Sequence, residues 1–183
     1  MKVWLNIIGY ELVWLAAAWG AVHDLPWLGV LAMVPFVLWY LSRPDGRADR
    51  PVFVVVLIGG SCLDSIYAAS GLIRYASPVP SAHAAPIWIA AIWGAFALTL
   101  RHSFRFLHGR PWLAALMGAI GAPLAYLGAG RFGYAVQFTR GEPAALVALA
   151  LGWAIALPAM LAFAAAMERS RPSDIRRSAA HVD

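Results

Sequence analysis

The chain has 183 residues, of which 62% are hydrophobic and 13% are charged, and its formal net charge is +5. Soluble domains carry roughly 45–50% apolar and about 25% charged residues, so this composition excludes a soluble globular domain and indicates a protein dissolved in lipid. The basic residues lie in short loops and near the C-terminal end, and no nucleic-acid-binding signature occurs, so we expect no nucleic-acid partner.

Apolar runs separated by polar, Pro or Gly residues predict an all-α, polytopic bundle of about six transmembrane helices. The expected spans are 3–22, 25–41, 52–72, 85–104, 111–129 and 144–166. The second is the shortest, at the lower limit of about 17 residues that a helical span needs, and Pro35 is a candidate kink in it. We expect residues 1–166 to form one transmembrane domain and residues 167–183 to form a polar, basic cytoplasmic tail.

The distribution of basic residues predicts the orientation of these spans. With the N-terminus inside, eleven Lys and Arg residues fall in the inner segments and three in the outer loops. The inner group consists of Lys2, Arg43, Arg47, Arg50, Arg101, Arg105, Arg110, Arg169, Arg171, Arg176 and Arg177. Because cytoplasmic loops collect Lys and Arg, this split predicts an even number of spans with both termini in the cytoplasm.

The first span carries Glu11, which lies about eight residues, or ~12 Å, into the membrane at the 1.5 Å rise of a helix. Its helical face includes Trp14 and Ala18. Asn6 lies about 140° around the same helix from Glu11, so the two polar groups need not serve one site.

The third span carries Asp64, about 20 Å deep by the same rise. The helical face around it is small and polar, and consists of Gly60, Ser61, Asp64, Tyr67, Ala68 and Gly71. The opposite face is apolar and is expected to face lipid, and it consists of Val55, Ile58, Cys62, Ile66 and Ile73. A charge at the bilayer centre costs about 2.5–3.5 kcal/mol, so we expect Asp64 to face the bundle interior, either as a functional acid or as a protonated group bonded to a neighbouring helix.

The fourth span ends in the sequence TLRHSFRFLHGR, residues 99–110. Here His102 lies near the inner boundary, within reach of Asn6, either as a site residue or as an interfacial histidine bonded to backbone or water. Arg101 and Arg105 share another helical face, and we expect both to reach the inner headgroups.

The fifth span is rich in small residues, which permit close helix packing in membranes. The small residues are Ala114, Gly118, Gly121, Ala122, Ala125 and Gly128. Tyr126 and Arg131 lie toward its outer end, and Arg131 either reaches outward to the headgroups or turns inward as a counter-charge.

There is no HExxH, GxSxG or P-loop in the sequence, and the GxGxxG spacing at residues 128–133 ends an apolar helical run and so lacks the strand-to-helix context of a nucleotide-binding motif. None of the five histidines pairs at a spacing of four residues, so we expect no metal site and no cofactor. Cys62 has no neighbouring base and is not expected to be a nucleophile. The expected partners are membrane lipids, with a homo-oligomer or a membrane complex as further options.

Four segments carry a resemblance to a known family: NIIGYELVWLAAAWGA, LDSIYAASGLIRYAS, APIWIAAIWGAFALTLRHSFRFL and LMGAIGAPLAYLGAGRFG. Over roughly residues 4–138 the chain resembles the domain of unknown function 2878 family. The pattern places an acid in the first span, Asp-Ser in the third and His-Ser at the end of the fourth. The resemblance implies a multi-pass protein of a bacterial inner membrane and implies no activity.

Three functional interpretations follow. The first is a small membrane enzyme or binding protein for a lipid or other amphiphile, with Glu11 and Asp64 as acid–base or orienting groups and Tyr67 and His102 assisting. The second is a structural subunit in which the same polar groups only fix helix packing, and the third is a proton-coupled carrier. A lipid-accessible cavity that touches the two acids would favour the first interpretation, and a fully packed core would favour the second.

Overall fold

The computed structural model of the chain describes residues 3–47 and 49–169. In this part of the chain there are six α-helices: α1 (Val3–Val22), α2 (Leu28–Leu41), α3 (Asp49–Ala69), α4 (Ile87–Ala97), α5 (Pro111–Arg131) and α6 (Glu142–Arg169). Two short 3-10 helices, η1 (Pro44–Arg47) and η2 (Arg105–Leu107), and two strands, β1 (Ile73–Tyr75) and β2 (Val136–Phe138), lie between them. The predicted all-α bundle is therefore largely confirmed, and the predicted tail lies outside the described residues from residue 170 on.

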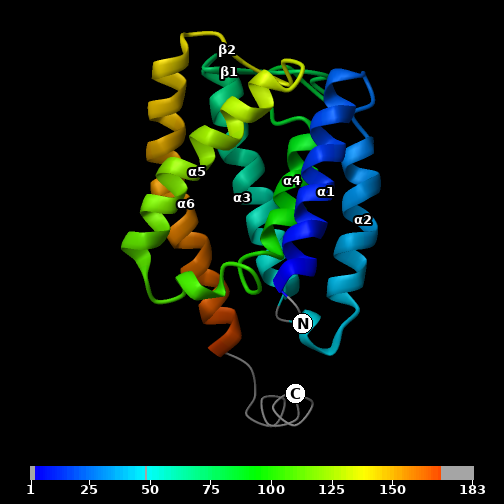
Figure 1. Cartoon of the computed structure of the whole chain (residues 1–183), viewed down its shortest axis with the longest axis vertical. Coiled ribbons are helices and arrows are strands. Elements are labelled where there is room, and N and C mark those ends of the chain that lie inside the picture. Colours follow the sequence, from blue (N-terminus) through cyan, green and yellow to red (C-terminus); the bar gives the residue numbers. More distant parts are fainter. Residues whose placement is uncertain (1–2, 48, 170–183) are drawn as a thin grey trace.

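The six helices run alternately up and down the bundle, so α1 begins and α6 ends at the same end of the molecule (Figure 1). The two strands lie at the opposite end (Figure 1). Four helices are long and apolar enough to cross a membrane: α1, α3, α5 and α6. The other two, α2 and α4, are apolar but shorter.

The fourth helix is shorter than the span predicted over residues 85–104. It has 11 residues and ends at Ala97, and a series of turns follows up to α5. The hydroxyl of Thr99 donates to the carbonyl oxygen of Phe96 at 2.7 Å, a local bond that competes with helix continuation. Leu98 and Leu100 in this segment are fully buried, and irregular backbone is tolerated at membrane depth where protein surrounds it.

The strand pair was not anticipated from the sequence. β1 and β2 are antiparallel, with Ile73 opposite Phe138 and Tyr75 opposite Val136. They join the α3–α4 connection to the α5–α6 connection. The third helix ends at Ala69, and Gly71 adopts a left-handed conformation (φ +68°) that breaks the helical direction. Ile73, predicted to face lipid from a helix, is therefore buried in a strand, and that prediction was wrong.

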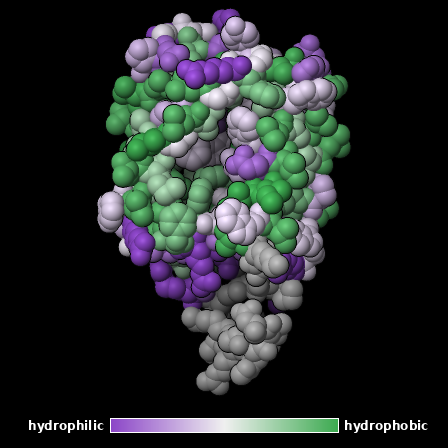
Figure 2. Space-filling view, in the orientation of Figure 1, coloured by the Kyte–Doolittle hydropathy of each residue, from purple (hydrophilic) through white to green (hydrophobic). Residues whose placement is uncertain are grey.

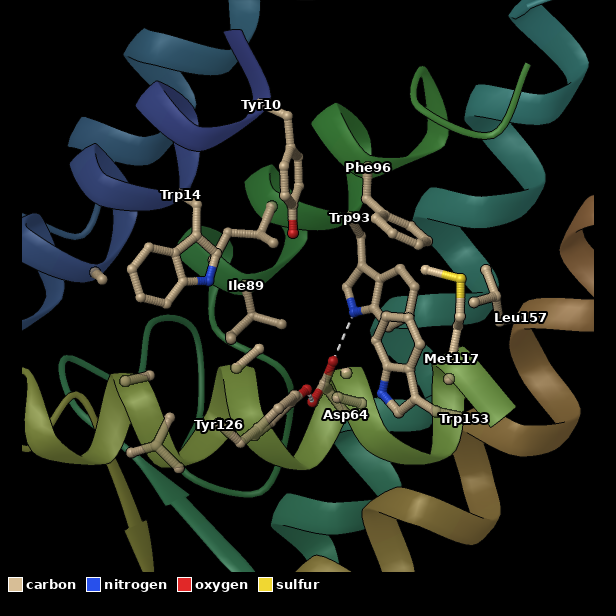
Figure 3. A pocket seen from close by; sticks show the side chains of 18 of the residues that line it. Tyr10, Trp14, Asp64, Ile89, Trp93, Phe96, Met117, Tyr126, Trp153 and Leu157 are labelled. Carbon is tan, nitrogen blue, oxygen red and sulfur yellow. Dashed lines mark hydrogen bonds between the residues drawn. The ribbon is translucent and has the colours of Figure 1, made fainter. Parts of the chain in front are cut away.

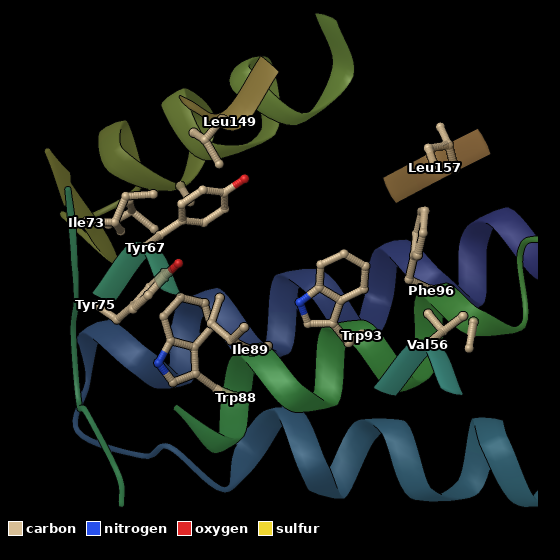
Figure 4. Packing of buried hydrophobic residues seen from close by; sticks show 14 of the residues in the cluster. Val56, Tyr67, Ile73, Tyr75, Trp88, Ile89, Trp93, Phe96, Leu149 and Leu157 are labelled. Carbon is tan, nitrogen blue, oxygen red and sulfur yellow. The ribbon is translucent and has the colours of Figure 1, made fainter. Parts of the chain in front are cut away.

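Aromatic side chains of α4 fill the centre of the bundle (Figure 4). Trp88, Trp93 and Phe96 are buried and pack against residues of α3 and α6, which include Tyr67, Leu149 and Leu157 (Figure 4). The hydrophobic core is thus built around α4, the shortest of the six α-helices described above.

The small residues of α5 serve two different purposes. A Cβ atom added to Gly118 would lie 2.3 Å from the carbonyl oxygen of Trp153, so here α5 and α6 touch through their backbones, as predicted. A Cβ atom added to Gly121 or Gly128 would meet nothing within 4 Å. The prediction of close packing is therefore wrong for these two glycines, which border open space.

The span count can be tested with topology reporters. We expect fusions in the 77–85 loop to report the side opposite to fusions at the C-terminal end, because the inner segments hold eleven of the fourteen basic residues. A third fusion, in the 23–27 connection between α1 and α2, should report the same side as the 77–85 loop if α2 crosses the membrane, because α2 and α3 then lie between the two sites. If it reports the side of the C-terminal end, α2 does not span and the six-span topology is wrong.

Candidate functional site

A cavity of about 230 Å³ opens in the side of the bundle. Figure 2 shows it as a hollow in a largely hydrophobic face, between the segments that Figure 1 labels α1 and α5. Its walls come from α1, α4, α5 and α6, with one residue each from α3, β2 and the turns after α4. The lining residues are Tyr10, Trp14, Ala18, Asp64, Trp88, Ile89, Ile92, Trp93, Phe96, Phe104, Met117, Gly118, Gly121, Ala122, Ala125, Tyr126, Ala129, Val136, Trp153 and Leu157.

Asp64 is the residue that α3 contributes to this cavity, and it is fully buried. Its Oδ1 atom accepts hydrogen bonds from the hydroxyls of Tyr75 and Tyr126. Its Oδ2 atom accepts one from Nε1 of Trp93 at 2.6 Å (Figure 3). β1, α5 and α4 thus each supply one donor to a carboxyl on α3. The prediction that Asp64 faces the bundle interior is confirmed.

The strand pair brings Tyr75 to this carboxyl from outside the helices. Its ring is buried and packs edge-on against Trp88, with ring centroids 5.9 Å apart. Burial raises the pKa of the Tyr75 phenol well above its ordinary value, and the nearby carboxyl of Asp64 adds to the shift. Tyr75 therefore remains a protonated hydrogen-bond donor at neutral pH.

The wall beside Asp64 is a continuous cluster of aromatic rings. Trp93 and Trp153 are stacked at 4.7 Å, and Phe96 packs edge-on against both, at 5.7 Å and 5.4 Å. Phe96 in turn contacts Tyr10 at 6.0 Å and Phe104 at 5.7 Å. Figure 3 shows Tyr10, Trp14 and Trp93 directed into the same space as the Asp64 carboxyl. The cavity thus combines one carboxyl with an apolar lining that is rich in aromatic rings.

The opposite wall is formed by small residues of α5. Gly121, Ala122 and Ala125 line the cavity, and all three lie close to Tyr126 in the sequence. Since a Cβ atom at Gly121 would meet nothing within 4 Å, the small side chains leave the volume of the cavity empty. The small residues that were interpreted from the sequence as a helix-packing surface therefore border an empty cavity at this position.

Glu11, the second predicted acid, does not meet Asp64. Its side chain is exposed, and it is absent from the residues that line the cavity. Its neighbour Tyr10 lines the cavity, as do Trp14 and Ala18, which share its helical face. Glu11 therefore lies at the margin of the opening, and the structure does not place the two carboxyls in one site.

Tyr67 lies one turn after Asp64 on α3 and is buried. Its hydroxyl donates to the carbonyl oxygen of Ala148 on α6 at 3.3 Å, and it does not line the cavity. The predicted assisting residue therefore ties α3 to α6.

His102 lies in the turns after α4 and is separate from the cavity. Its Nε2 atom lies 3.5 Å from Oδ2 of Asp49, and its ring is 4.9 Å from that of Tyr40. Asn6, which we expected within reach of His102, instead accepts a hydrogen bond from Ser103 and donates to the Tyr40 hydroxyl at 2.9 Å.

Arg101, in the same turns, differs from its prediction. It is buried rather than directed to the headgroups, and its Nη1 atom lies 2.5 Å from Oδ1 of Asp49. Arg105 is exposed, as predicted, and lies 3.3 Å from Glu168. The chain therefore carries a second polar cluster, around Asp49, near the helix ends where α3 begins.

Sequence reasoning missed the three donors to Asp64. Trp93 lies in the segment AAIWGA, and Tyr126 is placed only toward the outer end of a span rich in small residues. Neither pattern indicates a bond to a distant acid. Side-chain chemistry could have indicated the donors. An acid in an apolar span needs hydrogen-bond donors, and Trp and Tyr are the largely apolar residues that can supply them.

Comparison with known proteins gives one match. The model of a family described as "Protein of unknown function (DUF2878)" matches residues 3–159. This confirms the predicted family and extends the match into α6. No curated protein and no solved structure matches the chain. In the described part of the chain, no group of three or more His, Cys, Asp and Glu side chains is placed to hold a metal ion.

Proposed function

The chain belongs to the DUF2878 family of proteins of unknown function, and from the geometry of its cavity we propose that it is a membrane-embedded binding protein or enzyme for an amphiphile. The hydrocarbon chain of the ligand enters between α1 and α5, and its polar end meets Asp64. Following the charge distribution and the family resemblance, we assign the protein to a bacterial inner membrane with both termini in the cytoplasm.

The observation that carries this proposal is an open apolar cavity with a buried carboxyl in its wall. Ligand pockets are typically apolar concavities with a few placed polar groups that orient the ligand. The volume of about 230 Å³ is below the ~300–1,000 Å³ of pockets for drug-sized ligands. It suits one alkyl chain or one small headgroup rather than an entire two-chain lipid.

The surroundings of the opening support entry from the bilayer. The two helices that flank it expose large apolar side chains: Leu12 and Leu15 on α1, and Leu116, Ile120 and Leu124 on α5. Such surfaces are stable only against lipid. An amphiphile can therefore reach Asp64 sideways from the hydrocarbon layer without crossing water.

Asp64 is the group that would act on the ligand or orient it. Three donors hold the carboxyl in place, and Tyr126 lines the cavity beside it. A carboxyl fixed in this way is suited to hydrogen bonding or proton transfer at the polar end of a bound chain. Tyr67 and His102 have no part in this site, and Glu11 lies at its margin.

The structural-subunit interpretation remains the alternative, because the same three bonds tie α4, α5 and β1 to α3. In that case nothing would need to enter the cavity. A variant that fills the cavity without disturbing the packing separates the two interpretations.

The cavity can be filled through Gly121. Gly121→Leu places a side chain in open space, so we expect unchanged thermal stability in detergent and loss of the bound amphiphile. Gly128→Leu is the matched control, because Gly128 is also an open glycine of α5 and does not line the cavity. The measurement is native mass spectrometry of the purified proteins with their co-purified lipids and with added dodecyl amphiphiles. Equal occupancy in the two variants would contradict the proposal.

A further inference from the structure

We propose that the polar end of the ligand is a protonated amine, which donates an N–H to Oδ2 of Asp64 and places its positive charge among the aromatic rings of the cavity. This inference rests on the proposed function and adds the chemical class of the headgroup. It depends on three observations: the hydrogen-bonding capacity of Asp64, the charge of the lining residues and the arrangement of the rings.

The hydrogen bonds leave Asp64 with one open acceptor position. An ionised carboxylate offers about four lone-pair sites, two on each oxygen. The two phenols occupy both sites of Oδ1, and the Trp93 indole occupies one site of Oδ2. An indole N–H can only donate, so Oδ2 accepts from Trp93, and in the proposed complex Asp64 is the ionised partner of the bound amine. The remaining site is on Oδ2 of a fully buried residue in the cavity wall, and the proposed complex has the N–H of the ligand there.

The lining supplies no positive charge to balance this carboxylate. Among the described residues that line the cavity there is no Lys, Arg or His. Arg101 and His102, described above, belong to the separate cluster around Asp49. A buried carboxylate without a counter-charge is strongly unfavourable. A cationic ligand would supply the missing charge, whereas an alcohol would fill the acceptor site without neutralising it and an anion would be repelled.

The aromatic rings favour the same ligand. Cations are attracted to the faces of Trp, Tyr and Phe within about 6 Å of the ring centroid, and Trp is the strongest partner. Eight of the twenty lining residues are aromatic, and four of these are Trp: Trp14, Trp88, Trp93 and Trp153. Trp93 both bonds to Asp64 and stacks on Trp153, so the rings and the carboxylate meet at one place. An acid surrounded by rings is the arrangement expected for an ammonium group on an alkyl chain.

The test compares four ligands that share a dodecyl chain and differ in headgroup. Dodecylamine, dodecyltrimethylammonium, dodecanol and dodecanoate are titrated at pH 7 into the full-length protein in a neutral detergent, and bound ligand is counted by native mass spectrometry. Only binding that Gly121→Leu abolishes and Gly128→Leu retains is assigned to the cavity. We expect dodecylamine to bind at least tenfold more tightly than dodecanol, and dodecanoate to bind most weakly. Dodecyltrimethylammonium, which keeps the charge but has no N–H, should lie between dodecylamine and dodecanol.

Asp64→Asn should remove the preference for dodecylamine over dodecanol, because an amide carries no charge. Glu142→Gln, which removes an exposed carboxylate at the start of α6, should leave the preference unchanged. If dodecanol or dodecanoate binds in the cavity as tightly as dodecylamine, the amine assignment is overturned and the proposed function stands. If no dodecyl ligand binds in a Gly121-dependent way, the proposed function itself fails. The ranking in the unmodified protein decides the matter even if Asp64→Asn does not fold.

Discussion

Asp64→Leu is expected to lower the free energy of unfolding by about 3 kcal/mol or more, because three buried donors would lose their acceptor at ~1–3 kcal/mol each. These donors are the hydroxyls of Tyr75 and Tyr126 and the indole N–H of Trp93. Both phenols could turn toward another acceptor only if the cavity supplied one, and its lining is otherwise almost entirely apolar. The measurement is unfolding in mixed micelles, followed by helix content.

Two further variants separate hydrogen bonding from charge at this position. Asp64→Asn keeps an acceptor oxygen for one or two of the donors, so its loss of stability should be clearly smaller than that of the leucine variant. Cys62→Leu introduces the same side chain at an exposed position of α3 and should have little effect. A leucine variant at Asp64 that unfolds like the unmodified protein would show that the three donors do not depend on this carboxyl.

The helical periodicity of the sequence was sufficient to place Asp64 correctly. Small and polar residues on one side of α3 and branched apolar residues on the other fixed which side faces the bundle, and Asp64 is buried while Ile58 and Ile66 are exposed. This worked because a span surrounded by protein on one side and lipid on the other has a strict division of faces.

The same reasoning did not decide where Glu11 lies. Tyr10, Trp14 and Ala18 of the same helix line the cavity, but the side chain of Glu11 is exposed and does not line it. Whether an acid in the first span meets Asp64 depends on the cavity between α1 and the other helices. The presence of a cavity depends on how six elements are arranged, and no local pattern reports it.

The sequence could not identify the donors to Asp64, for a related reason. Tyr75 lies in a strand that pairs with residues more than sixty positions away. A strand of three residues is too short for its sequence pattern to predict the pairing of Tyr75 with Val136. Trp93 lies on a helix of 11 residues whose early end at Ala97 depends on local hydroxyl bonding and on burial of the following turns. Sequence periodicity identifies an apolar segment but does not decide where such a helix stops.

The second prediction concerns the buried ion pair of Arg101 and Asp49. Arg101→Met is expected to lower the free energy of unfolding by about 3–5 kcal/mol, because removing one partner of a buried pair leaves an uncompensated charge. The side chains of Arg101 and Asp49 are 5% and 2% exposed, and their closest nitrogen and oxygen atoms are 2.5 Å apart. Asp49 lies in the first turn of α3, where the helix dipole favours a negative charge, but this interaction is worth only about 0.3–1 kcal/mol at a typical site.

Arg105→Met is the matched control for this prediction, since Arg105 follows in the same turns and pairs with Glu168 at 3.3 Å while its side chain is 69% exposed. Exposed pairs contribute about 0–1 kcal/mol, so its effect should be small. The double variant Arg101→Met with Asp49→Asn should recover part of the lost stability, because it removes the unpaired charge together with its partner.

These measurements also decide whether Arg101 is buried against Asp49 or directed to the headgroups. If it reached the headgroups, as the sequence predicts, Arg101→Met and Arg105→Met would have similar small effects and the double variant would recover nothing. A large effect at Arg101 alone, reduced in the double variant, is the result that the buried pair requires.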